Sequence, residues 1–206
     1  MSEDRFCEWY QQASEQDKIL ANRVMELGEF FDDMLFKAGS STQDFVMCKM
    51  KMSNESDWVD SPVRLPDELE YFDYGNFGYS VTEYDNPDTV GRFDYEKQEL
   101  SVSPSHLEND AVILHEMIHM HECVINELPL FYHDAILICL YNDLLKKIPD
   151  LPPRIMEHGH ILNEQDLYEL GGLHDILFLL KSFDLDLKMG YKLGTVFGYG
   201  MANTNE

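Results

Sequence analysis

The stretch of residues 109–125 constrains the fold of this chain more than any other part of the sequence. Read as a helix, it is apolar on nearly every side, with Ala111, Val112, Ile113, Leu114, Met117, Ile118, Met120 and Val124. A helix that is apolar all round is buried in a protein core and not laid on its surface. Polar side chains interrupt this segment, among them His115, Glu116 and His119. Their burial costs free energy unless they have partners, so the segment predicts a buried helix that holds a polar site.

The spacing of these three residues predicts a metal site. Positions i and i+4 of a helix share one face, about 6 Å apart along its axis, so His115 and His119 can bind one zinc ion. Glu116 follows the first imidazole and can accept the proton of a zinc-bound water. A chance His-Glu-x-x-His is expected only about 0.03 times in a chain with eight histidines and nineteen glutamates. We therefore expect one Zn²⁺ ion on His115 and His119, with Glu116 as the catalytic base.

A catalytic zinc ion usually takes three protein ligands and leaves one position for water. The expected third ligand is His133, at the start of the next apolar helix and a short loop after the first pair. The alternatives that the sequence leaves open are Glu127, Asp134, Glu157 and His158.

The other histidines give weaker signals. His121 lies two residues beyond His119 and points away from its helix face, so we expect it in the surroundings of the site or in solvent. His158 and His160 are expected in a solvated loop, and His106 and His174 are expected to have no functional role.

Periodicity along the rest of the chain predicts an α+β fold. Helices are expected at 14–37, 131–148 and 164–188, strands at 44–52 and 77–84, a hairpin at 90–103, and a loop around Pro152 and Pro153. The expected architecture is zincin-like: an N-terminal helix, a small antiparallel or mixed sheet, the buried His-Glu-x-x-His helix and a mainly helical C-terminal part. A length of 206 residues fits a single domain, 1–206.

Charge and cysteine usage limit the partners and the compartment. The formal net charge is −24, and the segment from Glu55 to Glu99 contains thirteen acidic and three basic residues. Such a chain repels phosphate, so neither nucleic acid nor an anionic membrane is an expected partner. No apolar run reaches 18 residues, no cysteines form a CxxC pair and the first residues do not resemble a signal peptide. We expect a cytoplasmic protein.

Three segments together resemble the SprT-like zinc metallopeptidase domain. They are Gly91-Arg-Phe-Asp-Tyr, Glu99-Leu-Ser-Val-Ser-Pro-Ser-His-Leu and Val112-Ile-Leu-His-Glu-Met-Ile-His. The resemblance covers about residues 77–147 and leaves 150–206 as a helical extension. It implies a third zinc ligand on the following helix, which maps onto His133. The chain departs from the family in having Tyr132 where a glycine is frequent, in lacking a cysteine zinc ribbon and in being acidic, so the peptidase chemistry carries over better than a role on DNA.

The expected function is that of a zinc metalloendopeptidase with a peptide or protein substrate, and the negative charge favours a basic one. An extended peptide is expected to pair with the strand that ends near Ser103. Two alternatives stay open. His133-Asp134 and His174-Asp175 also suit a metal phosphohydrolase of the HD type, and a zinc-stabilised interaction protein without catalysis would keep the same ligands. The oligomeric state is not predicted.

Overall fold

The computed structural model describes residues 3–31, 72–125, 130–159 and 174–198, without the side chains of 3–5, 130–135 and 159. The chain groups into two compact units. The first comprises residues 1–31, 73–123 and 181–206, and the second comprises residues 32–72 and 124–180. Among the described residues there are six α-helices and three strands, so the fold is α+β as predicted. The expectation of a single domain stays a prediction.

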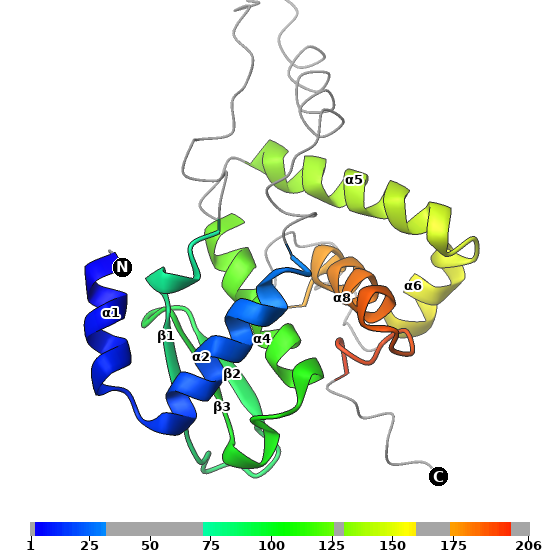
Figure 1. Cartoon of the computed structure of the whole chain (residues 1–206). Helices are drawn as coiled ribbons and strands as arrows, with labels where there is room; N and C mark the ends of the chain where they lie inside the picture. Colours follow the sequence, from blue (N-terminus) through cyan, green and yellow to red (C-terminus); the bar gives the residue numbers. More distant parts are fainter. Residues whose placement is uncertain (1–2, 32–71, 126–129, 160–173, 199–206) are drawn as a thin grey trace, which may run out of the picture. The chain divides into compact units, whose positions relative to one another are not determined.

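A three-stranded mixed sheet lies in the first unit (Figure 1). Strands β2 (Gly91–Asp94) and β3 (Glu99–Val102) form the predicted antiparallel hairpin. Strand β1 (Gly78–Val81) pairs with β3 in parallel, which gives the order β1-β3-β2. Because β3 has a neighbour on each side, the expectation that an extended peptide pairs with the strand ending near Ser103 is wrong. Among the described strands, β1 and β2 form the edges.

Helices α1 (Glu3–Gln12) and α2 (Glu15–Gly28) precede the sheet in the chain. The sequence predicted the second helix over 14–37, of which residues 32–37 lie outside the described residues, as does the predicted strand 44–52. Ser14 and Asp17 cap the start of α2 reciprocally in a capping box. The other carboxylate oxygen of Asp17 accepts the N–H of Val81 at 2.7 Å, which ties α2 to β1.

Helix α4 (Asp110–Ile125) is the predicted apolar helix, and the structure confirms that it is buried. It follows the short 3₁₀ helix η3 (Pro104–His106). Asn109 begins it, because its side chain accepts the N–H of Ala111 and its carbonyl accepts the N–H groups of Val112 and Ile113. Arg23 of α2 donates to the Asp110 carboxylate, with 2.7 Å from Nε to Oδ1. Helices α2 and α4 are thereby joined where α4 starts.

Helix α8 (Ile176–Met189) lies partly in each unit, since the division falls between Leu180 and Lys181. The sequence predicted a helix over 164–188, and residues 160–173 lie outside the described residues. Inside the first unit, the Lys181 ammonium lies 4.5 Å from the centroid of the Phe31 ring, and this ring stacks on His121 of α4 at 4.4 Å. Lys188 donates to the carbonyl of Phe30 at 2.6 Å. These contacts hold the part of α8 from Lys181 onward against the turn that follows α2, and this turn packs on α4.

The second unit contains α5 (Leu130–Lys147) and α6 (Leu151–Gly159). Helix α5 confirms the predicted helix 131–148. The expected loop around Pro152 and Pro153 is wrong, because both prolines lie in the first turn of α6. Proline is tolerated there, since the first N–H groups of a helix have no partner within it. None of the helices in the described ranges has the length and apolar character that a membrane crossing requires.

The capping box at α2 gives a graded prediction for stability. Ser14→Ala should lower the free energy of unfolding by about 1 kcal/mol, the usual value for losing a cap. Asp17→Ala should cost about 2 kcal/mol, because it also removes the hydrogen bond to the N–H of Val81. Urea denaturation measures both changes. Ser14→Gly is the control, with a loss of only a few tenths of a kcal/mol. Equal losses for Ser14→Ala and Asp17→Ala would mean that the bond to Val81 contributes nothing.

Candidate metal centre

Helix α4 holds the predicted site residues in the protein interior. His115, Glu116 and His119 are 1%, 2% and 7% exposed. The ring centroids of the two histidines are 5.2 Å apart and their planes meet at 74°. One face of α4 therefore presents two buried imidazoles side by side, as the i, i+4 spacing predicts.

A backbone carbonyl orients His115. Its Nδ1 lies 3.0 Å from the carbonyl oxygen of Val196, in the segment that follows α8. A carbonyl can only accept, so Nδ1 carries the hydrogen and the lone pair of the neutral ring is on Nε2. This is the arrangement of a metal-binding histidine, whose second nitrogen donates to a carbonyl or carboxylate.

A carboxylate orients His119 in the same way. Its Nδ1 lies 3.1 Å from Oε2 of Glu122, three residues further along α4, and the Tyr95 hydroxyl is 3.1 Å from the same nitrogen. Glu122 is 6% exposed, so its contact with the imidazole is shielded from water. Both histidines thus use Nδ1 for a hydrogen bond within the protein, so Nε2 is the atom with which each could bind a metal ion.

A glycine makes room for the Glu116 side chain. A Cβ atom at Gly91, the first residue of β2, would lie 2.9 Å from Oε1 of Glu116 and 2.8 Å from Cγ1 of Val112. Contacts this short do not occur between a Cβ and its neighbours. The Glu116 side chain therefore occupies volume that a side chain at position 91 would need, and the glycine leaves room for it.

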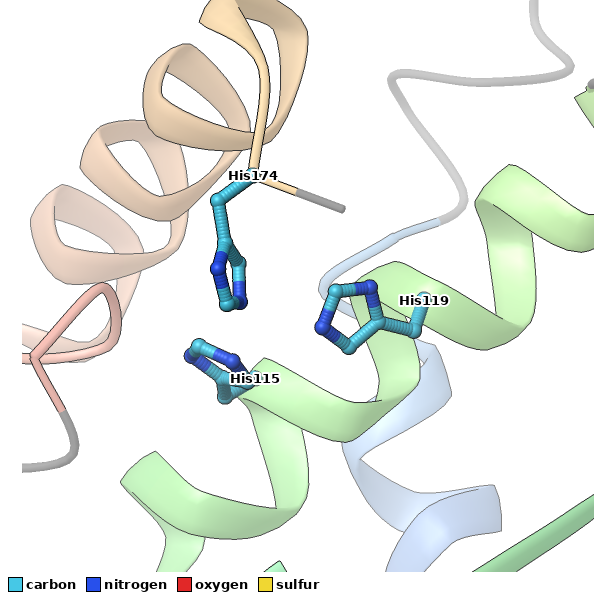
Figure 2. Close-up of side chains that lie close together, drawn as sticks. All are labelled: His115, His119 and His174. Carbon is cyan, nitrogen blue, oxygen red and sulfur yellow. The ribbon is translucent and has the colours of Figure 1, made fainter. Parts of the chain in front are cut away.

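The structure brings a third histidine to this pair. His115, His119 and His174 each offer a nitrogen, and these three atoms all lie within 4.8 Å of one another (Figure 2). Nitrogens at about 2.1 Å from one tetrahedral zinc ion are about 3.4 Å apart. His174 is partly exposed, whereas the other two are buried. The three imidazoles lie close enough to hold one metal ion, and imidazole is a ligand type that suits zinc.

The local sequence explains how His174 is held. Asp175 is the N-cap of α8, since its Oδ1 accepts the N–H of Phe178 at 2.9 Å. His174 precedes this cap and packs edge-on against the Phe178 ring, with centroids 4.7 Å apart. His174 had no place in the zinc site expected from the sequence, and the predicted helix 164–188 ran through it, whereas α8 starts at Ile176. An aspartate before the apolar run Ile176–Leu180 was the signal for a helix start at this histidine.

The structure describes only some of the other candidate ligands and histidines. The side chains of Glu127, His133, Asp134 and His160 lie outside the described residues, so the ligand role of His133 stays a prediction. Glu157 is exposed on α6, and His158 lies in the last turn of that helix and not in the expected loop. His106 lies 2.8 Å from the Ser103 hydroxyl.

His121 belongs to the core of the first unit. It is 1% exposed, and its Nε2 lies 3.1 Å from the Tyr74 hydroxyl. Burial, with the nearby charge of Lys181 as a smaller cause, lowers the pKa of His121 well below its usual value. This ring is therefore a neutral packing residue and is not solvated.

No known protein family, curated protein or solved structure matches this chain in sequence or structure comparisons. The resemblance to the SprT-like domain therefore stays a prediction that rests on the quoted motifs.

The close approach at Gly91 predicts an unusual cost for a small substitution. Gly91→Ala should lower the free energy of unfolding by about 1–3 kcal/mol, because the methyl group overpacks against Val112 and Glu116. The matched control is Gly78→Ala in β1, where the nearest atom, Cγ of Glu99, would lie at 3.4 Å. Urea denaturation compares the two variants. Equal stability of the two would show that Gly91 is not needed to accommodate Glu116.

The third ligand can be tested directly. His174→Ala should weaken zinc binding by more than the roughly 10–100-fold that loss of a ligand's hydrogen-bonding partner costs. Competition with a chelator of known zinc affinity measures the change, and His106→Ala is the control that should bind as wild type does. His133→Ala is measured alongside. Wild-type affinity in His174→Ala together with a loss in His133→Ala would assign the third ligand to His133 instead.

Proposed function

We propose that this chain is a zinc-dependent metalloendopeptidase with a zincin-like fold, in which Glu116 is the general base. The observation that carries the proposal is the set of buried polar side chains on α4 and their hydrogen bonds. Two buried imidazoles have their Nδ1 atoms engaged by Val196 and Glu122, and a buried carboxylate lies one residue after the first imidazole. Helices that only pack in a core have no need of this combination.

The donor set fits zinc. His115 and His119 are nitrogen ligands with oriented rings, and zinc is bound in proteins by nitrogen and sulfur donors in tetrahedral geometry. The third protein ligand is a histidine outside α4. His174 has the support of its position within 4.8 Å of the pair, and His133 has the support of the sequence. A bound zinc ion lowers the pKa of a water molecule towards about 7 and polarises a carbonyl oxygen.

The chain's own residues supply the proton transfer. Glu116 is ionised when it acts, accepts the proton of the attacking water and delivers it to the leaving amine. Gly91 leaves room for this carboxylate, and a base must lie within hydrogen-bond reach of the proton that it takes. The burial of Glu116 keeps bulk water from competing for that proton.

The proposed substrate is a peptide or protein. The net charge of −24 favours basic substrates through long-range attraction and disfavours nucleic acids. Since β3 is the central strand, an extended substrate could pair only with β1 or β2 among the described strands.

The alternatives have less support. An HD-type phosphohydrolase is helical throughout and would use Asp175 as a metal ligand, whereas this chain has a sheet and Asp175 caps α8. A purely structural zinc site is usually closed by four protein ligands. The metal-binding group in the described part of the chain has three histidines and the buried Glu116 beside it.

The proposal predicts a separation of zinc binding from catalysis. Glu116→Gln should lower the rate of peptide hydrolysis by about 10²–10⁴-fold, the usual contribution of a general base. Its affinity for zinc should stay within a few-fold of wild type, because Glu116 is not a ligand. The measurement is cleavage of a fluorogenic library of unstructured basic peptides by zinc-loaded protein.

Glu108→Gln is the matched control, since this exposed glutamate precedes α4 and should not affect cleavage. Unchanged cleavage in Glu116→Gln would refute the assignment of the base. Zinc-loaded wild-type protein that binds the metal but cleaves no peptide of the library would favour a site without peptidase activity.

A further inference from the structure

The residues that follow α8 fold back into the interior of the first unit. Gly190 and Gly194 have positive φ angles of 72° and 90°, which glycine adopts at little cost. The N–H of Tyr191 donates to the carbonyl of Asp186 at 2.7 Å. Val196 and Phe197 are then 0% and 8% exposed. The segment 190–198 is thus a structured connection with a buried end.

The carboxylate of Asp186 holds this segment. Asp186 lies in the last turns of α8 and is 0% exposed. Its Oδ1 accepts the N–H of Val196 at 2.9 Å, and its Oδ2 accepts the N–H of Gly194 at 2.7 Å. Burial raises the pKa of Asp186 to about 6, and the backbone N–H groups of residues 194–196 partly offset this effect. The carboxylate is therefore mostly ionised at pH 7, and its two hydrogen bonds are charge-assisted.

The same residue, Val196, then meets the metal centre. Its N–H is bound by Asp186 and its carbonyl oxygen lies 3.0 Å from Nδ1 of His115. Asp186 therefore holds one side of the Val196 backbone, its N–H, and His115 lies against the other side, its carbonyl oxygen.

We propose that Asp186 is a positioning residue for the metal centre, which fixes the orientation and the tautomer of His115 through the carbonyl of Val196. The proposal rests on the proposed function in one respect, the assignment of His115 as a zinc ligand. Asp186 does not touch His115, the substrate or the metal in this assignment. It holds the backbone acceptor that keeps the hydrogen on Nδ1 and the lone pair on Nε2.

A second buried aspartate of α8 serves as the control for an effect that is only structural. Asp184 is two residues earlier on α8, is 2% exposed and lies 3.1 Å from Nζ of Lys188. Replacing either aspartate removes a buried carboxylate from the same helix. Asp186 accepts the backbone N–H groups of Val196 and Gly194, whereas Asp184 faces the Lys188 ammonium, so we expect the replacement of Asp186 to affect His115.

The first test needs no substitution and no metal. Two-dimensional ¹H–¹⁵N NMR of the imidazoles reports which nitrogen carries the hydrogen. In metal-free wild-type protein near pH 7.5, neutral His115 should be more than nine-tenths in the Nδ1–H form. A predominant Nε2–H form would overturn the proposal even if no variant folded.

The second test compares Asp186→Asn with Asp184→Asn in the full chain. The Asn side chain can accept only one of the two N–H groups, so Val196 should be held less firmly. In Asp186→Asn the His115 signal should show a mixture of tautomers, and zinc affinity should fall by about 10–100-fold. Asp184→Asn should keep the wild-type tautomer and affinity, even where its unfolding midpoint falls as much.

The outcomes separate this proposal from the proposed function. Wild-type tautomer and zinc affinity in Asp186→Asn would overturn the positioning role and leave the peptidase proposal intact. Equal changes in both aspartate variants would also overturn it, because they would reflect a general loss of packing. Absence of zinc binding in wild-type protein would refute the proposed function, while the tautomer measurements would still decide whether Asp186 acts on His115.

Discussion

The burial of ionisable side chains in α4 is the constraint on which the rest of the described structure depends. Each polar side chain that leaves water must recover its hydrogen bonds inside the protein. Val196 supplies the acceptor for His115, and Glu122 supplies it for His119. The sheet supplies space for Glu116 through Gly91. Segments that are far apart in the sequence must therefore pack against α4. This need accounts for the turns after α8, which bring Val196 to His115, and for the glycine at the start of β2, which leaves room for Glu116.

The sequence predicted those parts whose cause is local. The apolar helix around His115 and His119, the hairpin 90–103 and the helix 131–148 follow from periodicity alone, and the structure has all three. Periodicity could not give the parallel pairing of β1 with β3, because that pairing is set by contacts distant in sequence. For the same reason it could not predict that β3 would be the central strand.

The remaining differences between prediction and structure arise where one sequence pattern is compatible with two local structures. Pro152 and Pro153 suggested a loop, but proline in a first turn is compatible with the start of α6. The predicted helix 164–188 ran through His174, whereas Asp175 caps a helix that starts after this histidine. The hydrogen bond from His115 to Val196 spans 81 residues, and no pattern within either segment indicates it. His133 remains a prediction from the sequence.

The two carboxylates of α4 have a consequence for charge balance. A zinc ion bound by neutral imidazoles brings two positive charges into a region of low dielectric constant, where an uncompensated charge is costly. Glu116 and Glu122, both buried on the same helix, are the carboxylates of α4 that could offset this charge. Under the proposed function, a metal ion that binds the folded centre and not the unfolded chain would stabilise the fold, so metal loading and the folding of α4 would be coupled.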